Sequence, residues 1–236
     1  MRVVRWALLF IAPLGLLGCP NVNTYGTART TPKGKVSHSV SAEGWGFNAE
    51  LETTDSNTGT TTKTDVNFFL PLPPSYHLRW GVDDSVDLGF HVNNASSLAF
   101  DGKFNLMKGR VDLAIDPGVQ WYNISVNEYS TNLFYFHGPL LIDFNVSQEL
   151  SFVLTPGVVY AYRTDSILAD TDVLKAATID GVFGRLGLGL NIRASKGFAV
   201  HPEVTVLRSF GEEKALTYMA GIGFNFVNLP DFSDIQ

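Results

Sequence analysis

The residues best suited to catalysis or metal binding are few, and their spacing favours neither. Ser37-His38-Ser39 places nucleophiles beside a base, but neighbouring side chains on a strand point to opposite faces, so the triplet cannot form a Ser–His pair by itself. Asp83-Asp84 lies beside a serine in a segment typical of a tight turn, where aspartate bonds the backbone. His77, His91 and His201 share a predicted orientation but lack metal-ligand spacing within one strand. The sequence therefore predicts no catalytic residues, no metal site and no cofactor.

A larger set of ionisable residues shares the polar face of the predicted strands. Its members are Arg79, Asp87, Asp101, Lys103, Arg110, Asp112, Asp116, Asp143, Arg185, Arg193 and Glu203. If this face lines the inside of a barrel, the charges must pair or be solvated, because burying a lone charge is costly. They predict either a salt-bridged plug or a narrow polar channel. The plug is favoured, since side chains nearly fill the interior of a barrel of this size.

The N-terminus carries features of export and lipid attachment. Two arginines precede an apolar run at 6–17, which is too short to span a bilayer and indicates a signal sequence. Leu16-Leu17-Gly18-Cys19 follows and resembles the lipobox of bacterial lipoproteins, in which the cysteine is diacylated and becomes the new N-terminus. The resemblance implies removal of 1–18, a palmitate-type anchor on Cys19 and a partner in the lipoprotein-processing machinery. The alternative is an ordinary secretory signal that happens to contain a cysteine.

Alternation of apolar and polar residues dominates the rest of the chain. Residues 182–193 keep a period of two for twelve positions, which excludes a helix. The same pattern predicts ten strands, at 37–52, 65–82, 86–94, 97–107, 110–123, 132–146, 150–163, 181–194, 198–208 and 217–227. Pro71, Pro73 and Pro74 interrupt the second strand, but Val66, Phe68, Leu70, Leu72 and Tyr76 keep one parity, which favours one long kinked strand. Two strands joined by a Pro-Pro turn are the alternative.

The connections alternate between tight turns and longer loops. This is typical of an outer-membrane barrel, in which the short turns are periplasmic. An even strand count places both termini on that side. We therefore expect an all-β, antiparallel up-and-down transmembrane barrel of about ten strands, with eight or twelve as alternatives. The expected divisions are a removed signal at 1–18, a lipidated flexible tether at 19–36, the barrel at 37–227 and a periplasmic C-terminal tail at 228–236.

Side-chain volume indicates which face meets lipid. The apolar face carries more large side chains than a ten-stranded interior could hold, so the polar face is predicted to point inward. The aromatic residues also separate into two belts, as expected at the two membrane interfaces. The outer belt is Trp121, Phe134, Tyr160, Tyr162 and Tyr218, and the periplasmic belt is Trp80, Phe144, Phe152, Phe198, Phe224 and Phe226.

Two segments resemble those of small bacterial outer-membrane β-barrel proteins. Residues 78–89, LRWGVDDSVDLG, look like a hairpin common in such barrels. Gly221, Phe224 and Phe226 are similar to the C-terminal signal read by the barrel-assembly machinery, although Met219 replaces a polar residue and 227–236 extend past the last aromatic. The resemblance covers about 37–227 and implies residence in the outer membrane, in contact with its lipid.

The predicted function is a structural or scaffold role for a lipid-anchored barrel, or a narrow polar pore, and not an enzymatic one. One alternative is an outer-membrane enzyme acting on lipid or peptide, and another is a soluble periplasmic barrel that binds a small ligand. A net charge of −6 argues against a nucleic-acid partner, which would need a basic face.

Overall fold

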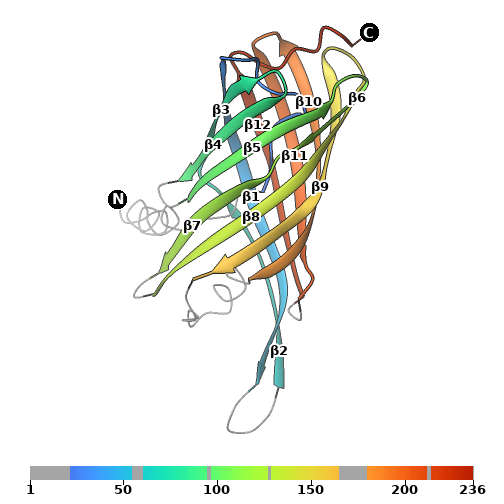
Figure 1. Cartoon of the computed structure of the whole chain (residues 1–236). Helices are drawn as coiled ribbons and strands as arrows, with labels where there is room; N and C mark the ends of the chain where they lie inside the picture. Colours follow the sequence, from blue (N-terminus) through green and yellow to red (C-terminus); the bar gives the residue numbers. More distant parts are fainter. Residues whose placement is uncertain are drawn as a thin grey trace, which may run out of the picture.

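All strand pairs of the sheet are antiparallel, and the first strand pairs with the last, so the sheet closes (Figure 1). The computed structural model describes residues 22–54, 61–94, 97–126, 129–164, 180–211 and 214–235. Its strands are β1 Val36–Thr54, β2 Thr61–Pro71, β3 Ser75–Asp83, β4 Val86–Asn94, β5 Ser97–Met107, β6 Val111–Ile115, β7 Gly118–Val126, β8 Tyr129–Asn145, β9 Leu150–Arg163, β10 Gly181–Ser195, β11 Phe198–Ser209 and β12 Lys214–Phe226. No helix in these ranges is long and apolar enough to cross a membrane.

The strand pairing confirms the ten predicted strands. β2 and β3 both pair with β1, and β6 and β7 both lie between β5 and β8. Each of these two pairs is therefore one barrel position interrupted by proline, because proline has no N–H to donate to the ladder. The twelve described strands form a closed antiparallel barrel of ten positions.

The predicted parity of the second strand is wrong on the N-terminal side of its prolines. Ser41 pairs with Ser75 and Gly44 pairs with Pro71, so two residues of β1 face three residues of the opposite chain. This is a bulge, and the extra residue reverses which side chains point inward. Leu70 and Leu72 therefore pack against the apolar cluster of the interior instead of facing lipid.

The ends of the barrel differ as the sequence predicts. β3–β4, β5–β6, β8–β9 and β10–β11 are joined by tight turns at one end, which we call the short-turn end. The last residues of β12 lie there, and the C-terminus is near it in Figure 1. At the other end, the outer end, the β1–β2 hairpin projects beyond the rest of the sheet.

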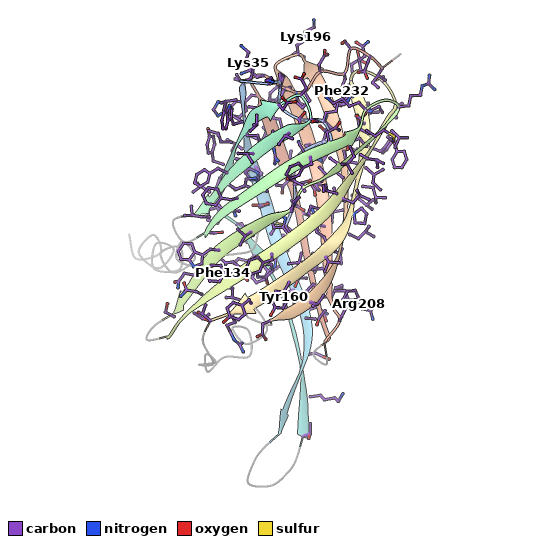
Figure 2. All side chains as sticks on the ribbon, viewed as in Figure 1. Lys35, Phe134, Tyr160, Lys196, Arg208 and Phe232 are labelled. Atoms are coloured by element: carbon purple, nitrogen blue, oxygen red, sulfur yellow. The ribbon has the colours of Figure 1, made fainter. Side chains whose placement is uncertain are left out.

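The exterior of the barrel is apolar. Trp80, Phe144, Phe152, Tyr160 and Tyr162 are each 46–51% exposed, and in Figure 2 side chains of this kind cover the outside of the sheet. Phe134 and Tyr160 lie toward the outer end of that surface, whereas Lys35 and Lys196 lie at the short-turn end. A soluble barrel would have the reverse arrangement, with charges outside. This is the architecture of a membrane-spanning barrel.

The outer half of the interior is apolar, which the sequence analysis does not predict. Inward-pointing residues there form one cluster of Trp45, Phe47, Tyr122, Leu133, Tyr135, Val159, Ala161, Phe183, Leu207, Ala215 and Met219. Only the half of the interior toward the short-turn end is lined mainly by charges. The inside thus has two layers of different chemistry.

Candidate functional site

Residues 22–32 lie inside the barrel, and we call them the plug segment. Tyr25, Ala28 and Thr31 are at most 2% exposed. The plug segment runs from the apolar cluster toward the short-turn end, where Gly34 donates to the Gly81 carbonyl at 2.7 Å just before β1 begins. Residues 22–32 of the expected flexible tether are therefore packed inside the barrel instead. Cys19 lies outside the described residues.

Carboxylates of the wall bind amides of the plug segment. Glu203 accepts from the backbone N–H groups of Thr24 at 3.0 Å and Tyr25 at 2.7 Å. Farther toward the short-turn end, Asp143 accepts from Ala28 N–H at 2.7 Å and Asp87 from Thr31 N–H at 2.8 Å. Hydrogen bonds to a charged acceptor are stronger than neutral ones. The inward carboxylates thus hold an extended main chain.

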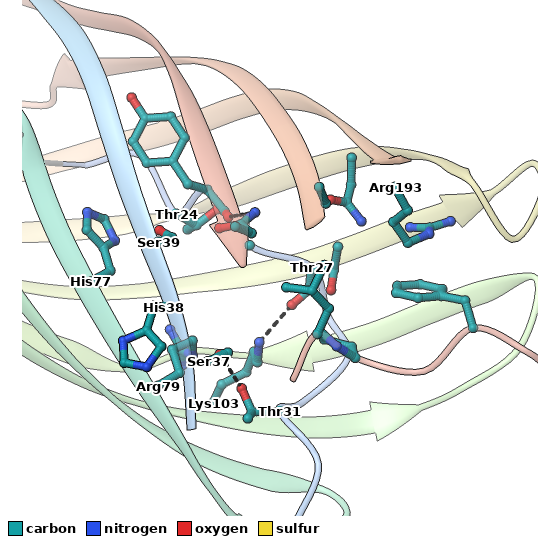
Figure 3. Close-up of a pocket in the computed structure, with 18 of the residues that line it drawn as sticks. Thr24, Thr27, Thr31, Ser37, His38, Ser39, His77, Arg79, Lys103 and Arg193 are labelled. Atoms are coloured by element: carbon teal, nitrogen blue, oxygen red, sulfur yellow. Dashed lines mark hydrogen bonds between the residues drawn. The ribbon is translucent and has the colours of Figure 1, made fainter. Parts of the chain in front are cut away.

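Donors of the wall bind carbonyls of the plug segment. These bonds run from Arg185 Nη2 to Val22 at 2.6 Å, from Asn225 to Tyr25 at 3.0 Å, from Lys103 to Thr27 at 3.0 Å and from Asn105 to Ala28 at 2.9 Å. The Lys103–Thr27 bond is drawn in Figure 3, beside a bond between the hydroxyls of Thr31 and Ser37 at 2.8 Å. The polar interior therefore satisfies the N–H and C=O groups of a segment that has no sheet partner of its own.

The side chain of Tyr25 packs against two glycines of β12, in space that a Cβ atom at either glycine would fill. A Cβ at Gly223 would lie 2.7 Å from Tyr25 Cβ, and one at Gly221 would lie 2.2 Å from Tyr25 Oη. The hydroxyl donates to Glu43 Oε2 at 2.8 Å. Tyr25 has φ = 45°, a left-handed conformation that a bulky residue adopts only when its surroundings impose it. The wall is shaped around this side chain.

Arg29 joins the plug segment to the C-terminal tail, residues 227–235. Its guanidinium pairs with Asp112 at 2.6 Å and with Asp234. Arg29 and Arg193 both lie over the ring of Phe232, at 4.4 and 3.6 Å from its centroid, and this ring is buried. The hydrogen bond from Arg29 holds the pKa of Asp234 below its ordinary value. The tail therefore folds back over the short-turn end.

A second charge cluster lies beside the plug segment. Arg79 Nη2 pairs with Asp87 at 2.8 Å, Asp101 at 2.5 Å and Asp116 at 3.2 Å. Lys103 lies 3.5 Å from Asp87. Arg79 of β3 thus pairs with three carboxylates, those of Asp87 in β4, Asp101 in β5 and Asp116, which follows β6.

The structure places ten of the eleven predicted inward charges inside the barrel. Arg110 differs, since it lies in the turn before β6 and is exposed. Alternation does not extend into a turn, so its parity there carries no information. In the predicted assembly signal, Phe224 is exposed, Phe226 is half-buried and stacks on His38, and Gly221 lies beside Tyr25.

The candidate catalytic groups do not assemble. Ser37 and Ser39 point inward and are buried, whereas His38 lies on the other face, with Nδ1 2.5 Å from the Tyr76 hydroxyl. His77 and His91 stack at 4.2 Å. Among the described residues, no group of three or more His, Cys, Asp or Glu is arranged to hold a metal ion.

Little space remains around the plug segment. The cavity in Figure 3, lined by residues that include Thr24, Ser39, His77 and Arg193, has a volume of about 60 Å³. A cavity needs roughly 10–15 Å³ for each water molecule. It therefore has room for a few waters and not for a solute of ordinary size.

The residues of the plug segment and tail that contact the wall, chiefly Tyr25, Arg29 and Phe232, could not be predicted from the sequence. These residues lie outside any alternating pattern, and their partners are on distant strands. One signal was available in the predicted inward set. In that set six acids, Asp87, Asp101, Asp112, Asp116, Asp143 and Glu203, outnumber five bases, Arg79, Lys103, Arg110, Arg185 and Arg193. The exposed position of Arg110 in the structure widens the excess. Such an excess requires further donors, and the plug segment supplies them.

Comparison with known proteins assigns no family, since no family model and no curated protein matches the sequence. Three solved structures with similar chain paths are outer-membrane proteins. The protease OmpT from Escherichia coli has a TM-score of 0.45 and 7% identity, with 81% of this chain and 96% of that chain covered. Ail from Yersinia pestis has 0.36 and 10%, covering 81% and 100%, and the NanC porin has 0.40 and 10%, covering 80% and 99%. The strand pairing and the apolar exterior define the fold.

Proposed function

We propose that the protein is a lipid-anchored barrel of the bacterial outer membrane with a structural or scaffold role, and that its interior is closed. The observation that carries the proposal is the plug segment, whose main chain is bonded to the wall along its length. A pore needs a continuous aqueous path, and here the polar interior is occupied by the chain itself. Above it the apolar cluster fills the outer half.

Outer-membrane residence is supported by the exterior of the barrel. A closed sheet leaves no edge strand, and every backbone group of the wall can bond within it, as the hydrocarbon core requires. The apolar side chains on the outside, with aromatic residues toward both ends, match the two interfaces. The lipid anchor is supported by the lipobox-like sequence at Cys19. Assembly and lipid attachment would use the barrel-assembly and lipoprotein-processing machinery.

The alternative functions have less support. A soluble ligand-binding barrel would place these aromatic residues in water, at a cost of about 25 cal/mol per Å² of apolar surface. An outer-membrane enzyme would need a nucleophile, a base and an orienting group in contact, and the Ser37–Ser39 triplet divides between two faces. We therefore propose no catalytic role.

Cell fractionation with gel mobility tests membrane residence. The protein is expected to stay in the membrane fraction after carbonate washing and to change its gel mobility on boiling, as integral barrels do. Recovery in the soluble fraction without a mobility change would contradict the proposal.

Fatty-acid labelling tests the anchor separately. Labelled palmitate is expected on the wild-type protein and not on Cys19→Ala, while both variants retain the mobility change. Equal labelling of the two, or none on the wild type, would refute lipid attachment at Cys19.

A further inference from the structure

The cavity beside the plug segment is lined by cations. It has a volume of about 60 Å³, and Arg79, Lys103 and Arg193 of the wall all line it (Figure 3). Among the described residues around it, none is an aspartate or a glutamate. Side chains with hydroxyl or amide groups complete the lining, chiefly Ser37, Ser39, Asn191 and Asn225. This chemistry favours an anion over a cation.

The carboxylates of the interior are directed to other partners. Asp87 and Asp143 accept hydrogen bonds from amides of the plug segment. Asp101 and Asp116, which both pair with Arg79, line a separate cavity of about 20 Å³ that lies beside residues of the apolar cluster. Of these two cavities, only the smaller is lined by carboxylates. The larger one lies on the cationic side of the same charge cluster.

Arg193 is the cation of this lining with the least compensation. Its side chain is buried, and no described carboxylate forms an ion pair with it. It donates instead to neutral oxygens, which are the Ser147 carbonyl at 2.9 Å, the Ser151 hydroxyl at 2.9 Å and the Gln148 carbonyl. These bonds use three of the five N–H groups of a guanidinium. The ring of Phe232, 3.6 Å away, offsets the charge only in part. Because a buried charge without a counter-ion is costly, the fold leaves Arg193 in need of an anion.

Size and access limit the occupant to a small ion. At roughly 10–15 Å³ for each water, the cavity has room for a few water molecules, and a halide ion is little larger than one of them. Leu229, Pro230 and Phe232 of the C-terminal tail line the cavity, and with Arg193 they also line a groove of about 630 Å³ at the short-turn end. An ion from the aqueous phase would therefore enter past the tail.

We propose that this cavity binds a small inorganic anion of halide size, with Arg193 as its principal partner. Lys103 and Arg79 add positive charge from the opposite wall, and the hydroxyl and amide groups can donate to the ion. The anion supplies the counter-ion that the described chain does not place beside Arg193. A held ion is compatible with a closed interior, because the apolar cluster still blocks the outer half.

Bromide diffraction tests the site in the unaltered protein. Bromide replaces chloride and scatters anomalously, so crystals of the full-length protein soaked in sodium bromide are expected to show an anomalous peak in the cavity, within hydrogen-bond distance of the Arg193 guanidinium. Bromide peaks confined to the surface, with only water in the cavity, would overturn the proposal.

Urea unfolding tests whether the anion binds in solution. At constant ionic strength, exchanging sodium gluconate for sodium chloride is expected to raise the unfolding midpoint of the wild type along a saturating curve, since a ligand of the folded state stabilises it. Arg193→Gln should abolish this rise. Arg208→Gln, which removes an exposed cation of β11, is the matched control and should retain it.

Two results of this titration would contradict the proposal. One is a wild-type midpoint that does not change with chloride, which would reduce a bromide peak to binding at crystal concentration only. The other is the same chloride dependence in Arg193→Gln as in the wild type. Heat-modifiable mobility verifies that both variants fold. If Arg193→Gln does not fold, the wild-type titration and the bromide peak still decide the matter.

Discussion

At the scale of residues, the interior recognises a main chain. Most wall contacts to the plug segment are to N–H and C=O groups, so they depend on the path of the segment more than on its side chains. Tyr25 and Arg29 are the exceptions. Their side chains contact particular partners, which are the glycines of β12 for Tyr25 and Asp234 of the tail for Arg29. Substitutions there test whether the plug segment is part of the folded state.

Gly223→Ala is expected to destabilise the barrel by about 1–3 kcal/mol, the usual cost of overpacking, because the new methyl group meets Tyr25. In a Tyr25→Gly background, which also suits φ = 45°, the same change should cost much less. Urea unfolding of the four variants measures this coupling. Gly138→Ala is the control, since a Cβ there meets nothing within 4 Å. An equal loss in the free energy of unfolding in both backgrounds would show that Tyr25 does not pack against Gly223.

Arg79→Ala is expected to lower the free energy of unfolding by about 3–5 kcal/mol, because it leaves buried carboxylates without their shared partner. The control is Lys33→Ala, which removes an exposed pair with Asp83 and should leave the unfolding midpoint unchanged. If the two variants have the same midpoint, the charge cluster is solvated and the interior is more open than described.

At the scale of elements, the strands could be predicted because alternation is a local property of the sequence. The bulge opposite β1 could not be predicted, since it depends on how many residues of the partner strand face 72–74. The plug segment was missed for a similar reason. Its bonds join Thr24 to Glu203 and Ala28 to Asp143, pairs more than 100 residues apart, and its own sequence resembles a linker.

The tail is the element whose docking responds to pH. The pKa of Asp234 is lowered by Arg29, so docking favours the carboxylate. Its contribution is complete above the ordinary pKa of aspartate and is lost as the pH falls through the lowered value. Hydrogen exchange in 229–235 should therefore increase below the ordinary range for an aspartate. Asp234→Asn should weaken that dependence, and the remainder comes from Asp231, whose pKa is lowered by hydrogen bonds from Ser233. Exchange independent of pH in the wild type, after correction for intrinsic rates, would refute the contact.

Phe232→Ala tests the other contact of the tail. The expected loss is about 2 kcal/mol, the range for cation–π contacts shielded from water. Unfolding in urea measures it, and Phe210→Ala, which removes a ring that is 69% exposed, is the matched control. A smaller loss for Phe232→Ala than for the control would place the tail away from the barrel.

At the scale of the whole molecule, the barrel is closed twice, by the plug segment and by the apolar cluster above it. The purified protein in a planar bilayer is therefore expected to show no steady ionic current. Replacing 23–31 by a Gly/Ser linker should lower stability, because the wall loses the side chains of Tyr25 and Arg29 as partners and a flexible linker loses more conformational entropy on ordering. Porin-like conductance of the wild type would contradict the proposed closed state.

Amide hydrogen exchange of the folded protein in lipid tests directly whether residues 22–31 lie inside the barrel. The amides of Thr24, Tyr25, Ala28 and Thr31 are bonded to wall carboxylates and are expected to exchange as slowly as those of the central strands. Exchange of these four amides at the rate of an unstructured chain would contradict the account.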